Sequence, residues 1–241
     1  MQIAERPSPS FNDRKRAVSL LVLHYTGMDD AEAAISRLCD PDAGVSAHYV
    51  VAEDGAVSRL VPEDRRAWHA GAGDWRGEGD VNSASIGIEI VNGGHCYGLP
   101  AFPDVQIAAV AALSKAIMAR HAIKPSGVIA HSDLAPERKL DPGERFPWRR
   151  LAAEGVGVWP TGVTGDRTVR HGPGRGSGET LARLQAGLRA IGYGEPGDGE
   201  YTARTSAVVA AFQRRFRPAP VDGLIDGETA NLIDAVARLT R

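Results

Sequence analysis

Two histidines and an aspartate lie where the chain could bring them to one site. His24 follows the apolar run of residues 18–23, and His131 follows the apolar residues 127–130. Asp141 lies ten residues after His131. Two imidazoles and one carboxylate would fill three positions of a tetrahedral zinc site and leave the fourth for water. Zinc held in this way would lower the pKa of that water toward about 7 and polarise a substrate carbonyl.

Glu89 and Lys139 are candidates for proton transfer and charge stabilisation. Glu89 lies in the alternating segment 85–91, in which isoleucines 86, 88 and 90 share one face and Glu89 lies on the other. A charged glutamate among apolar residues is costly unless it faces a polar cavity, and a general acid/base beside a metal is one such reason. Lys139 lies two residues before Asp141, where its charge could stabilise a developing oxyanion.

Each of these residues also has an ordinary structural interpretation. Histidines at strand ends often make structural hydrogen bonds, and Asp-Pro-Gly, which begins at Asp141, is a common turn. Glu89 alone would suit a solvated edge strand, and Lys139 alone would suit an exposed surface. Spacing by itself therefore leaves both interpretations open.

Strands and helices that alternate along the first 154 residues predict an α/β fold with a mixed central sheet flanked by helices. The turn dipeptide at residues 54–55 predicts a hairpin. A helix capped by Asp29 or Asp30 and a longer amphipathic helix after Pro103 are expected. The strands are predicted at residues 18–23, 47–51, 56–61, 85–91 and 127–130.

Residues 155–178 contain eight glycines without helical or strand periodicity, which predicts a connector between two domains. Beyond this connector, apolar residues recur at helical spacing in three segments, so residues 179–241 are expected to form a small three-helix domain. Asp198-Gly199 and Asp222-Gly223 each lie seven residues before a threonine, which is a short internal repeat. Such a unit is typical of a binding module, so we place catalysis in residues 1–154.

Composition and charge exclude several other classes. The 241 residues carry 28 basic and 30 acidic side chains, and this net charge of −2 argues against a nucleic-acid partner. Two cysteines are too few for a disulfide framework. We expect a monomer without a membrane span. The N-terminus resembles no signal peptide, which favours a cytoplasmic protein; the alternative is a periplasmic protein from which a signal was removed.

The motifs around these residues resemble the type 2 N-acetylmuramoyl-L-alanine amidases, a family similar also to phage T7 lysozyme and the peptidoglycan recognition proteins. The resemblance spans residues 18–148, and it implies cleavage of the amide between N-acetylmuramic acid, or its 1,6-anhydro form, and L-alanine. Its motifs are His24-Tyr25-Thr26, Ala67-Trp68-His69-Ala70-Gly71, Ser85-Ile86-Gly87-Ile88-Glu89, Gly127 to Asp133, and Arg138 to Gly143.

The resemblance also implies a role for each candidate residue. His24, His131 and Asp141 are then the Zn²⁺ ligands, Glu89 is the catalytic acid/base, and Lys139 stabilises the transition state. Tyr25, Trp68 and His69 are expected to contact the substrate. Trp75 and Tyr97, which lie in glycine-rich loops, are further candidates for stacking on sugar rings.

Residues 179–239 resemble the three-helix peptidoglycan-binding domain. Leu184-Gln185 and Phe212-Gln213 match its Leu-Gln and Phe-Gln pairs. The repeat is imperfect, because Thr202 stands where the second copy has Asp226. The alternative function is a recognition protein that binds peptidoglycan without cutting it. Such relatives usually lack a metal ligand, whereas this chain has all three, which favours hydrolysis.

Overall fold

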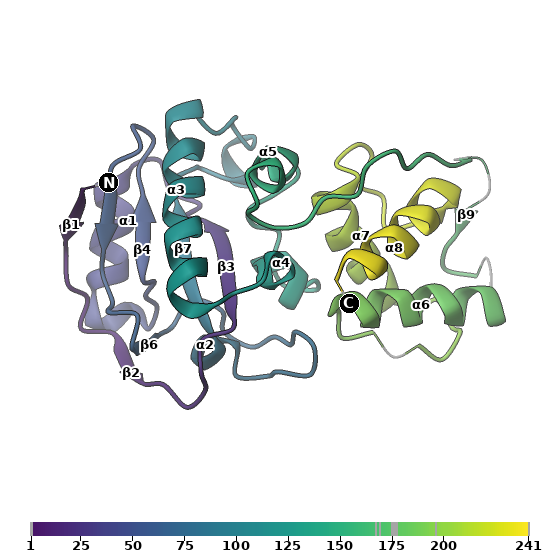
Figure 1. Cartoon of the computed structure of the whole chain (residues 1–241), viewed down its shortest axis with the longest axis horizontal. Coiled ribbons are helices and arrows are strands. Elements are labelled where there is room, and N and C mark those ends of the chain that lie inside the picture. Colours follow the sequence, from purple (N-terminus) through teal and green to yellow (C-terminus); the bar gives the residue numbers. More distant parts are fainter. Residues whose placement is uncertain (1, 167, 169, 175–177, 196, 241) are drawn as a thin grey trace.

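The structure, a computed structural model, describes residues 2–166, 168, 170–174, 178–195 and 197–240. Its N-terminal part contains a six-stranded sheet with helices on both faces (Figure 1). Strands β5 and β4 pair antiparallel and the other neighbours pair parallel, which confirms the predicted mixed sheet. In spatial order the strands are β1 (Ile3–Glu5), β5 (Val57–Arg59), β4 (Tyr49–Val51), β7 (Ser85–Ile90), β3 (Leu20–Tyr25) and β8 (Val128–Ala130).

The two faces of this sheet bury different partners. Isoleucines 86, 88 and 90 pack with the apolar face of α3 (Asp104–His121). On the opposite face, Val50 of β4 packs with Ile35 and Leu38 of α1 (Ala31–Cys39). Glu89 points to this second face, as the period-two alternation of its strand predicts. The site therefore lies on the side of the sheet that α1 partly covers.

Local signals explain most boundaries of the elements. The carboxylate of Asp30 accepts a hydrogen bond from the Ala33 amide and caps α1. Strand β3 extends to Tyr25, two residues beyond the predicted end, so His24 lies inside the strand. His131 begins the short helix α4 (His131–Leu134) directly after β8. The other elements here are β2 (Phe11–Asp13), β6 (Arg65–Ala67), α2 (Val81–Ala84), α5 (Trp148–Ala153) and 3₁₀ turns at Pro41–Ala43, His95–Tyr97 and Pro125–Gly127.

The C-terminal part contains the three expected helices, α6 (Glu179–Ile191), α7 (Ala203–Phe216) and α8 (Gly227–Leu239). Gln185 and Gln213 are fully buried and play the same part in each copy of the repeat. The Oε1 of Gln185 accepts a hydrogen bond from the Gly199 amide at 2.8 Å, and the Oε1 of Gln213 accepts one from the Gly223 amide at 2.9 Å. The glutamines thus fix the two Asp-Gly turns.

The helices that follow these turns are capped by different residues at equivalent positions. Thr202 accepts a hydrogen bond from the Thr205 amide, and Asp226 accepts one from the Thr229 amide. Threonine and aspartate are both good N-cap residues. The mismatch in the repeat is therefore a change of capping side chain with the cap retained. Among the described residues, no helix is both long and apolar enough to cross a membrane.

The two parts of the chain share one cluster of buried apolar side chains. Val22 and Ile129 of the sheet, Leu134 of α4, Tyr193 and Phe212 all belong to it. Figure 1 shows α6, α7 and α8 grouped beside α4 and α5. The C-terminal helices are thus docked on the N-terminal part through a common core.

The predicted connector is more ordered than its composition suggests. Residues 170–171 form β9 (Arg170–His171), which pairs antiparallel with β10 (Ile225–Asp226). The carbonyl of Asp166 accepts a hydrogen bond from the Gly227 amide, and Trp159 packs on the shared cluster. Residues 167, 169 and 175–177 of the predicted connector lie outside the described residues. The described part of residues 155–178 therefore contacts the C-terminal helices, through the β9–β10 pairing and the Asp166–Gly227 hydrogen bond.

Trp75, a candidate for stacking on sugar rings, is buried instead of facing a substrate. Trp75 is 2% exposed and packs edge-on against Tyr193, with ring centroids 5.0 Å apart. Its ring is therefore part of the contact between the two parts of the chain. Tyr97, in contrast, is 57% exposed.

Candidate metal centre and active site

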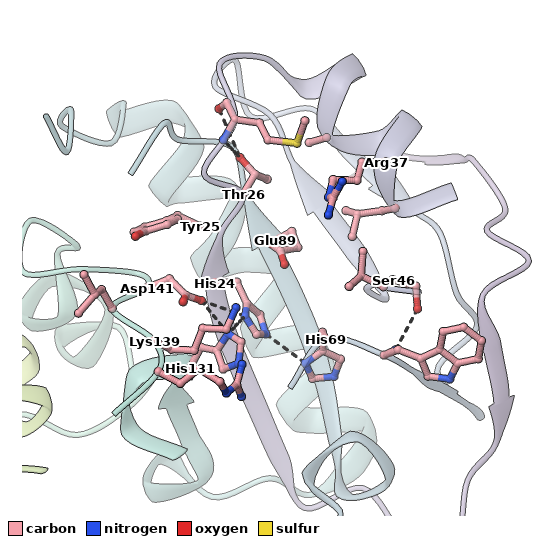
Figure 2. Close-up of a pocket in the computed structure, with 17 residues that line it drawn as sticks. His24, Tyr25, Thr26, Arg37, Ser46, His69, Glu89, His131, Lys139 and Asp141 are labelled. Carbon is pink, nitrogen blue, oxygen red and sulfur yellow. Dashed lines mark hydrogen bonds and ion pairs between the residues drawn. The ribbon is translucent and has the colours of Figure 1, made fainter. Parts of the chain in front are cut away.

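The β3–β7 pairing sets the first two groups of the site. His24 and Glu89 are register partners on these parallel strands, so their side chains leave the sheet on the same face. Strand β8 pairs with β3 on its other side and delivers His131 just beyond its end. The loop that follows α4 returns Asp141 to the same place, and Figure 2 shows these four side chains around one pocket.

His24, His131 and Asp141 converge through three atoms. The Nδ1 atoms of the two histidines are 2.9 Å apart, and the Oδ2 of Asp141 lies 3.1 Å from Nδ1 of His24 and 3.0 Å from Nδ1 of His131. All three residues are buried, and together they form a group that could hold a metal ion. The sequence motifs thus led to three residues that the fold brings together.

The surroundings of His24 and Asp141 favour the protonation states in which such groups bind metals. Burial, reinforced by His131, lowers the pKa of His24 to about 4, although Asp141 acts in the opposite direction. Burial alone would raise the pKa of Asp141, but the neighbouring His131 and hydrogen bonds from His131 and His24 hold it far below its usual range. An uncharged imidazole and an ionised carboxylate are the forms that ligate metals.

The Nε2 atoms of both histidines, which point away from Asp141, form hydrogen bonds with the loop that follows β6. The Nε2 of His131 donates to the carbonyl oxygen of Ala70 at 2.9 Å, and Arg138 donates to the same oxygen. The Nε2 of His24 lies 3.1 Å from Nδ1 of His69. These contacts leave the Nδ1 atoms of both histidines facing Asp141, as a preorganised metal site would require.

Glu89 lies beside this centre without a counter-charge in contact. Its Oε2 is buried and has no hydrogen-bond partner among the described residues. Burial, and next the negative charge of Asp141, raise the pKa of Glu89 well above its usual value, while Lys139 acts in the opposite direction. A carboxyl group whose pKa is raised in this way is a stronger proton acceptor than a solvated one, which suits general acid/base chemistry.

The cleft around these groups has a volume of about 410 Å³, and Lys139, Tyr25, Trp68 and His69 all line it. Tyr25 turns its hydroxyl toward Nδ1 of His95, 3.0 Å away. The indole Nε1 of Trp68 donates to the side-chain oxygen of Asn12, so the ring is held at the cleft wall. The structure thus brings eight of the ten candidate residues to one cleft, whereas Trp75 and Tyr97 do not line it.

The cleft also contains residues that are not among the candidates from the sequence. Arg37 reaches it from α1, and Arg138 borders it beside Lys139, with Met28, Ser46 and Leu140 adding to the wall. Arg37 lies on the solvent side of an ordinary amphipathic helix, so no pattern marks it. Arg138 belongs to a motif that was recognised, but its hydrogen bonds to the carbonyl oxygens of Ala70 and Ala72 depend on the tertiary fold.

Comparison with protein families gives two matches along the chain. Residues 14–144 match the N-acetylmuramoyl-L-alanine amidase family. Residues 177–233 match a peptidoglycan binding domain family. The first match contains every candidate site residue, and the second contains both Asp-Gly turns.

Three comparisons with individual proteins extend these matches. N-acetylmuramoyl-L-alanine amidase AmiD of Escherichia coli K12 is 36% identical, and the alignment covers 97% of this chain and 90% of that protein. Its complex with the substrate anhydro-N-acetylmuramic acid-L-Ala-D-γ-Glu-L-Lys superposes with a TM-score of 0.78 at 35% identity, over 95% of this chain and 98% of that one. AmpDh3 of Pseudomonas aeruginosa, in complex with anhydromuramic pentapeptide, gives a TM-score of 0.75 at 30% identity, over 93% and 92% of the two chains.

Proposed function

This chain belongs to the N-acetylmuramoyl-L-alanine amidase family, and we propose that it is a zinc-dependent amidase that cleaves the bond between N-acetylmuramic acid and L-alanine in peptidoglycan or muropeptides. The observation that carries the proposal is the convergence of His24, His131 and Asp141 beside Glu89 in one cleft. A recognition protein that only binds would have no need of this complete set.

The donor set fits zinc. Two imidazole nitrogens and one carboxylate oxygen are ligands that zinc accepts in catalytic sites, where three protein ligands leave a position for water. Both histidines have their other ring nitrogen engaged, which leaves their lone pairs directed at a common point beside Asp141. Zinc bound there supplies a Lewis acid that polarises the scissile carbonyl and makes water a stronger nucleophile.

The residues of the chain then handle protons and charge. As a water oxygen attacks the carbonyl carbon, Glu89 is placed to accept a proton from that water. The C–N bond breaks when the same carboxyl group returns the proton to the departing nitrogen of L-alanine, so the products are a muramic carboxylic acid and a free peptide amine. Lys139 lines the same cleft and offsets the negative charge that develops on the carbonyl oxygen.

The substrate class follows from the relatives and from the cleft. Both relatives whose complexes superpose on this chain hold anhydromuramyl peptides. Tyr25 and Trp68 add aromatic surface to the cleft, and Arg37 and Arg138 add positive charge. Aromatic rings suit sugar contacts, and guanidinium groups suit the carboxylates of a stem peptide. We therefore assign muropeptides, including the 1,6-anhydro form, as substrates.

We assign residues 1–154 to the catalytic domain, 155–178 to the connector and 179–241 to a peptidoglycan-binding domain in a monomeric protein. The match of residues 177–233 to a peptidoglycan binding domain family supports the last assignment. The extended glycan would then contact the C-terminal helices while one muropeptide unit occupies the cleft.

Mass spectrometry of digests tests reaction, metal and substrate together. Intact sacculi and purified anhydromuropeptide are each incubated with the full chain, with and without a chelator. Free peptides that begin with L-alanine are expected in the absence of chelator, and added zinc should restore the reaction. Products that retain the muramyl–alanine bond, or turnover that resists the chelator, would refute the proposal.

Polymer binding needs a separate measurement. The full chain carrying Glu89→Gln is mixed with sacculi in the presence of saturating soluble anhydromuropeptide, which occupies the cleft. Sedimentation of the protein with the sacculi is then expected, because the C-terminal helices still bind the polymer. Complete release by the soluble ligand would assign all binding to the cleft.

A further inference from the structure

A chain of hydrogen bonds leads away from the metal centre through His69. The Nε2 of His24 lies 3.1 Å from Nδ1 of His69, and the Nε2 of His69 lies 3.3 Å from the hydroxyl of Ser85. That hydroxyl lies 2.6 Å from the carbonyl oxygen of Val81. The four groups link the end of β3 to helix α2 through the interior, and Figure 2 shows the first link as a dashed line between His24 and His69.

The Val81 carbonyl, at the end of this series of hydrogen bonds, sets the donor and the acceptor of each one. The carbonyl oxygen of Val81 can only accept, so the single proton of the Ser85 hydroxyl is donated to it. The Ser85 oxygen therefore accepts from Nε2–H of His69, which leaves Nδ1 of His69 as an acceptor. His24 in turn donates from Nε2, and its Nδ1 keeps a lone pair directed at the point between His131 and Asp141.

The fold provides a close-fitting seat for the His69 ring. A β-carbon added to Gly87 would lie 2.4 Å from Cγ of His69, so only glycine fits at this point of β7. The side-chain oxygen of Asn82 accepts hydrogen bonds from the backbone amides of His69 and Ala70 at 3.0 and 2.8 Å. His69 is 8% exposed, so most of its surface is buried against neighbouring residues.

We propose that His69 is a positioning residue for the metal centre: it orients the ring of His24, and Ser85 sets the direction of the hydrogen bond between them. This inference rests on the metal site of the proposed function. It replaces the expectation that His69 mainly contacts the substrate. Groups that hold the ligands of a metal in this way typically change its affinity 10- to 100-fold.

Zinc affinity, measured by competition with a chromophoric chelator, tests the proposal without any substrate. His69→Leu should lower zinc affinity about 10- to 100-fold. His69→Gln should recover most of the loss, because its amide oxygen can accept from Nε2–H of His24. His121→Gln is the matched control; His121 bonds Glu63 far from the cleft, and this variant should bind zinc like the wild type.

The role of Ser85 is tested by combining variants. Ser85→Ala should weaken zinc binding in the wild-type background and have no further effect in the His69→Leu background, because Ser85 acts only through His69. Equal effects in the two backgrounds would overturn the proposal. So would His69→Leu with wild-type zinc affinity and a raised KM, which would return His69 to substrate binding.

Two further readouts separate this inference from folding and from the proposed function. The melting temperature of each metal-free variant shows whether it folds. If His69→Leu does not fold, ¹⁵N spectra of His24 in Ser85→Ala decide the matter, and an unchanged proton position on its ring would overturn the proposal. A wild-type chain that binds no zinc would refute the proposed function itself, whereas tight zinc binding by every variant refutes only the role of His69.

Discussion

Arg215 of α7 and Asp133 of α4 form an ion pair that is almost completely buried, with 2.6 Å between nitrogen and oxygen and side chains 3% and 0% exposed. Tyr193 donates a hydrogen bond to the other oxygen of the same carboxylate at 2.6 Å. Asp133 lies two residues after His131 and also accepts from the Ala130 amide. The C-terminal helices therefore hold the segment that carries His131, a proposed metal ligand.

Removing one partner of this pair should destabilise the protein strongly. Arg215→Met leaves the Asp133 carboxylate buried without its counter-charge, which typically costs about 3–5 kcal/mol. Urea denaturation of the metal-free protein measures the loss. The control is Arg183→Met, which breaks an exposed pair with Asp234 and should change the free energy of unfolding by less than about 1 kcal/mol. Equal losses for both variants would contradict the prediction.

Deleting residues 155–241 should impair the part that remains. The deletion exposes Leu134 and Trp75, which are buried in the shared cluster, and leaves Asp133 without Arg215 and Tyr193. We expect residues 1–154 to aggregate or to melt well below the full chain, in contrast to the separable domains that a glycine-rich connector suggests. A soluble fragment with the melting temperature of the full chain would show that the docking contributes little.

Glu89→Gln should separate metal binding from turnover. The substitution keeps the size of the side chain but removes the proton acceptor, so kcat should fall about 10²- to 10⁴-fold. Zinc content, measured on the same sample, should stay at one ion per chain because Glu89 is not among the three ligands. Glu154→Gln, at an exposed pair with Lys115, is the control. Near-normal kcat would remove Glu89 from the reaction.

Lys139→Ala should act mainly on kcat. If the ammonium group stabilises the oxyanion, its loss lowers kcat about 10²-fold and changes KM little. Steady-state kinetics with a soluble anhydromuropeptide distinguish the two parameters. Lys115→Ala removes an exposed lysine outside the cleft and should have no effect. A rise in KM with an unchanged kcat would instead assign Lys139 to substrate binding.

Glu63 should make stability depend on acid pH. Burial alone would raise its pKa, but hydrogen bonds from Arg120, Tyr49 and His121 outweigh burial and lower it from 4.5 to about 2. Its contribution is therefore complete above pH 4.5 and disappears as the pH falls toward 2. Unfolding of metal-free wild type and Glu63→Gln between pH 2 and 5 should show a steeper loss for the wild type. Parallel curves would contradict this.

The candidate residues that line the cleft could be named from the sequence because they lie in motifs that resemble one family, while their spacing alone left their roles open. His24, Glu89 and His131 stand on or just after short apolar strands, and neighbouring parallel strands place such residues together. The contacts of Trp75 could not be predicted, because a tryptophan in a glycine-rich loop has the same local pattern whether it faces sugar or protein. The Asp133–Arg215 pair joins residues 82 positions apart, and neither has a local signal.

The unequal loops of the internal repeat have a consequence for how such a protein can diverge. Gly199 lies 14 residues after its glutamine, whereas Gly223 lies only 10 after its own. The longer loop carries Tyr193, which donates to one oxygen of Asp133, while Arg215 on α7 pairs with the other. Mutations in the longer loop can therefore weaken or strengthen the contact between the two parts of the chain, while the hydrogen bonds of Gln185 and Gln213 to the Asp-Gly turns are kept.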